Sequence, residues 1–361
     1  MAHSLGILNG KEILGVAPNT LSAPIAVLLE MTRKCNLRCL HCFSNSGDVT
    51  TKELSTSQWK EIIDQLVEMK VFLLFISGGE PLIRPDFFEL TKYIIDNGFD
   101  ACLLTNATLI TPQAARKIRK IGLYKVEANL DGPCADVYDE FRGVKGSFEA
   151  TIKGIKALKA AGFPVRINVV VNKLNYDKIP KILDVAVELG ANDVALLRLS
   201  PGGRALQNWD KIVLTDEEYD ELSPLFKSLR EAYSRKLLLA WEGDTVLGSL
   251  VDPFGLHPAC GAGRFHFTIT PTGAVKPCPS WDDDDPFAIA GNCSTERLID
   301  IWKDSKLFKL LQTADIPLCR DCEKRGCMGG CRLRAYQKYG GLPGGPDPRC
   351  KRLKQSSEIS N

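Results

Sequence analysis

Short apolar runs alternate with segments of helical periodicity through the first part of the chain. Residues 25–31 and 71–77 are mainly apolar runs of strand length. Residues 55–70 and 84–98, which follow these two runs, repeat apolar residues at the three-to-four spacing of an amphipathic helix. The same alternation continues to about residue 200 and predicts six strands with intervening helices. Repeated strand–helix units require a parallel sheet with right-handed crossovers.

The fold class that this pattern predicts is α/β, with a partial, TIM-like (β/α)6 barrel. Periodicity alone does not separate a partial barrel from an open doubly wound sheet, and six units are too few for the complete eightfold barrel. In either fold the functional residues collect at the C-terminal ends of the strands. The short polar sequences found there are "TRKCNLRCLHC", "GGEP", "TNAT", "NLDG", "NK" and "RLSPGG".

The pattern changes after residue 200. A helical stretch at 215–235 leads to "KLLLAWEGD", which predicts one more strand, and from Cys260 onward Gly, Pro and Cys dominate. A segment with so few long apolar elements needs support beyond an apolar core. We therefore expect an N-terminal segment (1–23), a barrel (24–240) and a small Cys-rich C-terminal domain (241–361).

Composition excludes several classes of protein. The 361 residues are 44% apolar and 25% charged, which is typical of a globular protein, and the formal net charge is only +2. That balance gives no support to a nucleic-acid or anionic-membrane partner. No apolar run approaches the ~20 residues of a membrane span, and the N-terminus lacks the features of a secretory signal. We expect a cytoplasmic location.

Thirteen cysteines are unusual for such a chain, and their distribution indicates metal or redox chemistry. Three fall within residues 35–42 and eight within 260–350. Cys102 and Cys134 stand alone, and we expect both to be buried as small apolar side chains.

The first group, "CNLRCLHC", places Cys35, Cys39 and Cys42 in one short loop after the first strand. Zinc would require a fourth protein ligand, which His41 could supply. However, His41 directly precedes Cys42, and adjacent side chains in a tight loop tend to point apart. The alternative is a 4Fe–4S cluster held by three cysteines, with one iron left for a ligand outside the protein.

"CNLRCLHC" after the first strand and "SGGEPLIRPDF" after the second resemble the two motifs of radical S-adenosylmethionine (SAM) enzymes. The resemblance implies that the amino and carboxylate groups of SAM chelate the open iron. One electron from the cluster would then cleave SAM to methionine and a 5′-deoxyadenosyl radical, which abstracts hydrogen from a substrate. Gly78, Gly79 and Pro81 would shape a backbone that approaches SAM closely, and Glu80 would accept from its ammonium group.

The same resemblance assigns further residues at the strand ends. Asn106, Asn129, Asp131 and Arg198 occupy positions where such enzymes usually contact SAM or substrate. Each also has an ordinary interpretation, because Asn and Asp are common turn residues and Arg198 could form a structural ion pair. Asp244, after the last predicted strand, is a candidate general base because some enzymes of this type use an aspartate in that region.

The C-terminal sequences "CGAGRFHFTITPTGAVKPC", "CRDCEKRGCMGGC" and "GLPGGPDPRC" are similar to the SPASM extension of radical SAM enzymes, which carries two auxiliary iron–sulfur clusters. The resemblance assigns the first auxiliary cluster to Cys260, Cys278 and Cys331. It assigns the second to Cys319, Cys322, Cys327 and Cys350. A pair of structural zinc sites is the alternative.

Two features depart from the usual SPASM pattern. Four residues separate Cys322 from Cys327, where five are usual, and no cysteine follows Cys260 within the next few residues. The fourth ligand of the first auxiliary cluster could be Cys293 or His266, or the position could be open to substrate.

Within the SPASM group the chain resembles maturases of the mycofactocin and pyrroloquinoline-quinone type. This implies a small ribosomal precursor peptide as substrate, an electron donor such as flavodoxin or ferredoxin, and a leader-binding protein. The leader-binding protein should be separate, because only about 23 residues precede the first strand. Related proteins instead modify cofactors, by haem-type decarboxylation or in tungsten-enzyme maturation. An iron–sulfur electron carrier is the non-enzymatic alternative.

The acidic sequence "WDDDDP" (281–286) has two interpretations. The simpler is a solvated loop. The other is a surface that attracts a basic segment of a substrate peptide.

Overall fold

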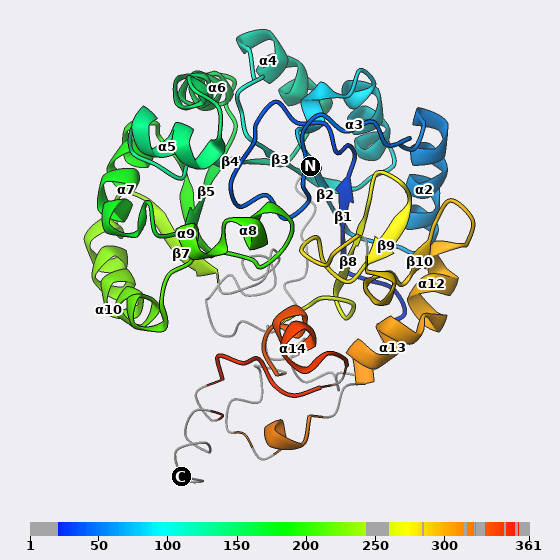
Figure 1. Cartoon of the computed structure of the whole chain (residues 1–361). Helices are drawn as coiled ribbons and strands as arrows, with labels where there is room; N and C mark the ends of the chain where they lie inside the picture. The colour runs from blue at the N-terminus through cyan, green and yellow to red at the C-terminus, as the bar shows by residue number, and fades with distance from the viewer. Residues whose placement is uncertain are drawn as a thin grey trace, which may run out of the picture.

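The computed structural model describes most of the chain as a curved sheet surrounded by helices (Figure 1). The described residues are 21–242, 260–283, 285–313, 316–320, 322, 329–342, 344–350 and 353.

The strands form one sheet in the order β10-β9-β8-β1-β2-β3-β4-β5-β6-β7. Every neighbouring pair from β1 to β7 is parallel, which confirms the predicted α/β partial barrel. The strand predicted in "KLLLAWEGD" is β7, and it pairs with β6 as part of the same sheet. The bounds of these strands are β1 Ala26–Glu30, β2 Leu73–Ser77, β3 Asp100–Thr105, β4 Lys125–Asn129, β5 Val165–Val171, β6 Asp193–Arg198 and β7 Leu238–Glu242.

Helices cover the outer face of this sheet (Figure 1). Several begin at the residue types that cap helices well: Ser55 with Gln58, and Thr215 with Glu218, form capping boxes. The helices of the barrel are α2 Thr56–Glu68, α3 Phe87–Asp96, α4 Pro112–Ile121, α5 Ala135–Arg142, α6 Ser147–Ala160, α7 Ile179–Glu188, α8 Arg204–Gln207, α9 Trp209–Ile212 and α10 Asp216–Tyr233.

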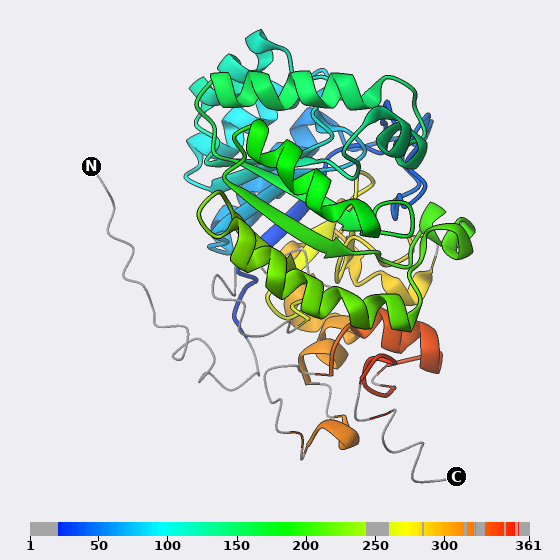
Figure 2. The ribbon, with the colours of Figure 1, turned by 90° about the vertical axis from the view of Figure 1, so that its left-hand side faces the viewer.

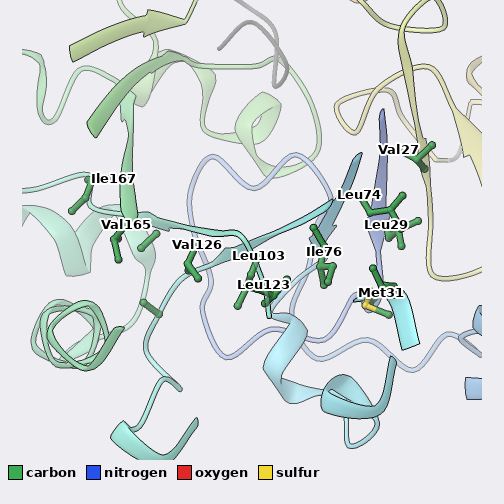
Figure 3. Packing of buried hydrophobic residues seen from close by; sticks show 14 of the residues in the cluster. Val27, Leu29, Met31, Leu74, Ile76, Leu103, Leu123, Val126, Val165 and Ile167 are labelled. Atoms are coloured by element: carbon green, nitrogen blue, oxygen red, sulfur yellow. The ribbon is translucent and has the colours of Figure 1, made fainter. Parts of the chain in front are cut away.

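Side chains of β1 point alternately to the two faces of the sheet, and each face has its own apolar cluster. Val27, Leu29 and Met31 join the large apolar cluster between the strands and the helices (Figure 3). Ala26 and Leu28 point to the other face, where they pack with side chains of β2 and β3. The outer layer supplies most of the buried apolar surface and so holds the strand ends in place.

The C-terminal part continues the barrel sheet, an arrangement that the sequence did not predict. Strand β8 (His266–Ile269) pairs in parallel with β1, and β9 (Ala274–Lys276) and β10 (Gly291–Asn292) follow in antiparallel pairs. These strands are only two to four residues long, too short for a period-2 pattern to be recognised. In the part of the C-terminal segment that the structure describes, the helices are α12 Leu298–Asp304, α13 Lys306–Thr313 and α14 Arg332–Tyr339, drawn in orange and red beside the barrel (Figure 2).

Apolar packing attaches this C-terminal part to the barrel. Phe267 on β8 lies 5.9 Å from Trp302 and 6.0 Å from Phe308, measured between ring centroids. The indole Nε1 of Trp302 donates to the carbonyl oxygen of Leu21 at 3.0 Å. The segment therefore has an apolar core that is continuous with that of the barrel.

Removing a large side chain from this core should lower the free energy of unfolding. Replacing Trp302, which is 1% exposed, with alanine is expected to destabilise the protein by about 3–5 kcal/mol. The matched control is Phe287→Ala, because Phe287 is 72% exposed and its loss should change stability little. Urea unfolding midpoints of the two variants would test this, and equal midpoints would show that the aromatic cluster does not hold the C-terminal part.

Two carboxylates of the "WDDDDP" loop have partners within the protein, which the interpretation as a solvated loop did not include. Asp283 forms ion pairs with Arg33, from the loop after β1, and with Lys276 on β9 at 2.5 Å. Asp285 accepts a hydrogen bond from the hydroxyl of Tyr336 at 2.7 Å. Lys276 and Arg33 are both buried, so their charges need these partners. The loop therefore joins the barrel to the C-terminal part.

The two isolated cysteines differ in burial. Cys102 on β3 is buried, as expected, whereas Cys134 is exposed and the prediction for it is wrong. Cys134 is the N-cap residue of α5, at the point where the chain leaves the strand edge for the surface helix.

Among the described residues, no helix has the length and apolar character that crossing a membrane requires.

Candidate functional site

The cysteine loop begins directly beyond the C-terminal end of β1. Its two ends are joined by backbone hydrogen bonds: the Cys35 N–H donates to the Gly47 carbonyl at 3.1 Å, and the Gly47 N–H donates to the Arg33 carbonyl at 2.9 Å. The loop is thereby closed on itself, and its three cysteines are presented at the strand edge where the sequence placed the site.

The three thiols of this loop lie near one another. Burial raises the pKa of Cys35 to about 12, the N–H of Leu37 lowers it, and the proximity of Cys39, Glu80 and Cys42 raises it further. Burial also raises the pKa of Cys39, against the lowering effect of Arg142. These effects show that Cys35 and Cys39 lie near each other and that both lie near Cys42.

His41 does not join the three thiols. Its ring stacks on Phe141 with centroids 4.3 Å apart and planes 6° from parallel. Burial, with Arg142 and Arg204 nearby, lowers the pKa of His41 well below its usual value, so the ring is neutral. This stacking supports the expectation that His41 and Cys42 point apart.

The "GGEP" loop after β2 holds the cysteine loop through its backbone. The Gly79 N–H donates to the Thr32 carbonyl at 2.6 Å, and the Glu80 N–H donates to the Lys34 carbonyl at 2.9 Å. Gly78 has a φ of 143°, and a Cβ there would lie 2.6 Å from the Thr32 oxygen. A Cβ on Gly79 would overlap the Lys34 carbonyl. The two glycines therefore allow two loops to pack against each other.

Glu80 is fully buried, and its carboxylate is held by neighbouring strand ends. The hydroxyl of Thr105 donates to both oxygens at 2.9 and 3.0 Å, and the Asn106 N–H donates to Oε2 at 2.9 Å. The Leu82 N–H, in the 3-10 turn Pro81–Ile83, donates to Oε1 at 3.3 Å. Burial raises the pKa of Glu80 to about 7, while these hydrogen bonds lower it. The side chain is a fixed acceptor that links β2 to β3.

Asn106 and Asn129 lie at the ends of their strands as predicted. The Asn106 Nδ2 is 3.9 Å from the Cys35 sulfur and donates to the Asn36 side chain at 3.0 Å, so Asn106 borders the cysteine loop. Asn129 is the last residue of β4, and its carbonyl accepts from the Tyr138 hydroxyl at 3.3 Å.

Asp131 and Arg198 have partners within the protein. Asp131 is fully buried, forms an ion pair with Arg142, and accepts from the Val170 N–H at 2.6 Å. The guanidinium of Arg198 lies over the rings of Tyr219 and Trp241, 5.1 and 5.4 Å from their centroids. Their direct contact with SAM or substrate stays a prediction. Asp244 lies outside the described residues.

The structure adds residues that the sequence did not single out. The Arg204 side chain donates to the Cys39 carbonyl at 3.0 Å, and its N–H donates to the Cys42 carbonyl at 2.9 Å. The amide of Asn208 donates to the Leu40 carbonyl at 3.2 Å. These residues lie more than 160 positions along the chain from the loop residues that they contact, so no local spacing could have identified them.

In the C-terminal part, cysteines from three separate segments come together. Burial raises the pKa of Cys278, and the proximity of Cys260 and Cys331 raises it further. The Cys331 N–H donates to the Asp347 carboxylate at 3.0 Å, which fixes the start of α14. The nearness of Cys260, Cys278 and Cys331 agrees with the ligands predicted for the first auxiliary cluster. Of the ligands predicted for the second cluster, Cys319, Cys322 and Cys350 are described, and Cys327 lies outside the described residues.

The surroundings of Cys293 argue against its suggested role as fourth ligand of that group. Its thiol donates to the Gly273 carbonyl at 3.1 Å in the turn between β8 and β9, and it belongs to the apolar core. Burial raises its pKa to about 12 with no cysteine among the causes. His266, the other candidate, is buried with its ring against Gly261, next to Cys260 in the chain. Burial lowers its pKa to about 4, so the ring is neutral.

Loss of the Cys293 thiol should therefore leave the metal content unchanged. We expect Cys293→Ala to bind the same amount of iron per chain as the unmodified protein after anaerobic reconstitution. Cys260→Ala is the matched variant, and it should lose about four iron atoms, the content of one 4Fe–4S cluster. A similar loss in both variants would place Cys293 among the ligands.

Comparisons with known proteins follow the same division of the chain. Residues 29–186 match the family described as "Radical SAM superfamily", and residues 260–323 match SPASM, an "Iron-sulfur cluster-binding domain". The chain is 36% identical over 344 residues to the mycofactocin maturase MftC of Mycolicibacterium smegmatis, covering 91% of this chain and 83% of the relative. The chain belongs to the radical SAM superfamily.

Two more relatives and one solved structure complete this comparison. The AdoMet-dependent heme synthase of Methanosarcina barkeri is 31% identical, with 88% of this chain and 94% of the relative covered. The PqqA peptide cyclase of Bradyrhizobium diazoefficiens is 30% identical, with 92% and 87% covered. Streptococcus suis SuiB bound to S-adenosylmethionine has the same fold, with a TM-score of 0.75 and 21% identity over 92% of this chain and 78% of that one.

This radical SAM protein is an enzyme, and SAM and iron–sulfur clusters are its cofactors. The residues fit such a site: three mutually close thiols stand beside a fixed buried carboxylate, at the ends of neighbouring strands. Among the described residues, no group of three or more Cys, His, Asp or Glu side chains is arranged around a single metal ion. In a four-iron cluster, by contrast, each cysteine binds a different iron atom.

Proposed function

We propose that this enzyme uses SAM to modify a small precursor peptide. One observation carries the proposal: a chain with the cysteine triplet and the buried Glu80 at adjoining strand ends is 36% identical to a maturase over nearly its whole length. A relative named as a peptide cyclase, 30% identical, supports a peptide as the substrate class. Decarboxylation and crosslinking are the outcomes we favour.

Cys35, Cys39 and Cys42 would hold the SAM-binding cluster. When bound, cluster and SAM together supply the 5′-deoxyadenosyl radical that takes hydrogen from the substrate. Glu80, fixed by Thr105 and the Asn106 N–H, offers acceptor oxygens to the ammonium group of SAM. Glu80 is fully buried in this structure, so the loops around it must move for SAM to reach its carboxylate.

The remaining predicted site residues have narrower roles in the proposal. Gly78, Gly79 and Pro81 shape the loop that carries Glu80, and Asn106 lines the cysteine loop. Asn129 and Arg198 stand at the substrate side of the strand ends. Asp244 stays the candidate general base.

We propose two auxiliary 4Fe–4S clusters in the C-terminal domain. Cys260, Cys278 and Cys331 would hold the first, with His266 or the substrate at the fourth position. The second would be held by Cys319, Cys322, Cys327 and Cys350. They would accept the electron that remains when a product radical is oxidised.

The proposal also keeps the division of the chain into a segment 1–23, a barrel 24–240 and a C-terminal domain 241–361. The family matches at 29–186 and 260–323 lie within these bounds. The partners of the enzyme would be a one-electron donor such as flavodoxin or ferredoxin and a separate leader-binding protein. A cytoplasmic location stays a prediction.

A second function, modification of a haem-type cofactor, is favoured by the 31% identity to a heme synthase over 94% of that relative. Anaerobic incubation with SAM and reductant would separate the two. One arm contains candidate precursor peptides and the other a haem precursor with propionate side chains. We expect a mass change in a peptide, and a mass change confined to the haem precursor would overturn the peptide proposal.

A further inference from the structure

The last turn of α5 and the glycine after it are docked on the cysteine loop. The carbonyl of Phe141 accepts from the Leu40 N–H at 2.9 Å, and the carbonyl of Arg142 accepts from the Arg38 N–H at 3.0 Å. A Cβ on Gly143 would overlap the Arg38 carbonyl, so the two backbones are in direct contact. We call residues 141–143 the α5 clamp.

The clamp brings one charged side chain to a cysteine sulfur. The Arg142 Nη1 lies 3.6 Å from the Cys39 sulfur, and its Nη2 forms an ion pair with Asp131. Arg142 is 4% exposed and Asp131 is fully buried. The guanidinium also lies over the Tyr138 ring, 5.5 Å from its centroid. Its position is therefore fixed by three neighbours, with one N–H aimed at sulfur.

Hydrogen bonds from two further residues fix the position of Asp131. The Val170 N–H on β5 donates to its Oδ1 at 2.6 Å, and the Asn175 amide donates to its main-chain carbonyl at 2.8 Å. The row from Val170 through Asp131 and Arg142 to Cys39 thus crosses the interior from β5 to the cysteine loop. Charges in such a dry region interact strongly because little solvent screens them.

We propose that Arg142 raises the reduction potential of the cluster held by Cys35, Cys39 and Cys42, and that the carboxylate of Asp131 limits this effect. The inference rests on the proposed function, because it assigns that cluster to the triplet. Reduction adds one electron to the cluster and removes one from the donor. A hydrogen bond and a positive charge at a ligand sulfur stabilise the more negative, reduced state. The buried negative charge of Asp131, on the far side of Arg142 from the cluster, opposes this stabilisation of the reduced state.

The sign of the effect separates this role from a purely structural one. Arg142→Gln removes the positive charge and should make the cluster harder to reduce. Asp131→Asn removes the negative charge, keeps an acceptor for the Val170 N–H, and should make the cluster easier to reduce. A structural defect would not move the potential in opposite directions in the two variants. Arg142→Lys keeps the charge and should stay near the unmodified protein.

The test is an anaerobic potentiometric titration of full-length reconstituted protein, followed by electron paramagnetic resonance. The signal that changes on addition of SAM identifies the SAM-binding cluster. At a fixed solution potential, the ratio of reduced to oxidised cluster should fall at least tenfold in Arg142→Gln and rise in Asp131→Asn. For a one-electron couple, tenfold corresponds to about 59 mV.

A matched control removes packing without changing charge. Phe141→Leu loses the stack on His41 and should leave the reduction potential unchanged. Shifts in the same direction for Arg142→Gln and Asp131→Asn, or no shift in Asp131→Asn, would overturn the inference. If Arg142→Gln does not retain iron, the reduction potentials of Asp131→Asn and Arg142→Lys test the inference in its place. A protein without any SAM-responsive cluster would instead contradict the proposed function.

Discussion

Replacing Cys35 with alanine is expected to abolish the formation of 5′-deoxyadenosine from SAM. Cys35, Cys39 and Cys42 are the three mutually close thiols at the end of β1, and a four-iron cluster with one open iron needs all three. Iron content should fall by about four atoms per chain, while the iron of the two proposed C-terminal clusters remains. Chromatography of an anaerobic reaction with SAM and reductant measures the nucleoside, and iron analysis measures the loss of one cluster.

The control for this variant is Cys134→Ala. Cys134 is the exposed N-cap of α5 and makes no side-chain capping hydrogen bond, so its removal should change neither iron content nor nucleoside formation. If Cys35→Ala still formed 5′-deoxyadenosine at the rate of the Cys134→Ala control, the triplet would not hold the SAM-binding cluster. The assignment of cofactor chemistry to the β1 edge would then fail.

The features of this protein that could be predicted from sequence are local. The strand–helix alternation is periodic over many residues, and "CNLRCLHC" and "GGEP" each directly follow a strand. Since parallel strands end at the same edge, the meeting of Cys35 with Glu80 follows from order along the chain. The partial barrel and the position of the site were predictable for this reason.

The contacts that support the cysteine loop were not predictable, because they are non-local. Arg142 reaches Cys39 across 103 positions and Arg204 reaches it across 165, and neither residue belongs to a spaced motif. Asp131 was assigned to ligand contact by family resemblance, and the ion pair of its carboxylate with the buried Arg142 was not predicted. Likewise, the hydrogen bond of the Cys293 thiol to the Gly273 carbonyl could not be predicted from the spacing of the cysteines.

A different change, Gly79→Ala, is expected to impair the same chemistry without removing any ligand. A Cβ at Gly79 would overlap the Lys34 carbonyl, which accepts the Glu80 N–H at 2.9 Å. The "GGEP" loop must then move away from the cysteine loop, and the Glu80 carboxylate moves with it. Overpacking of this kind costs about 1–3 kcal/mol. We expect SAM affinity to fall by roughly tenfold, because a cost to binding of about 1.4 kcal/mol, which lies within this range, corresponds to tenfold.

Isothermal titration of SAM into the reconstituted protein would measure this loss. Gly341→Ala is the matched control, because a Cβ there meets nothing within 4 Å. The same methyl group added at Gly341 should leave SAM affinity and iron content unchanged. If Gly79→Ala bound SAM as tightly as Gly341→Ala, close packing of the two loops would not position Glu80. The hydrogen bonds to its carboxylate from Thr105, the Asn106 N–H and the Leu82 N–H would then be enough to position Glu80.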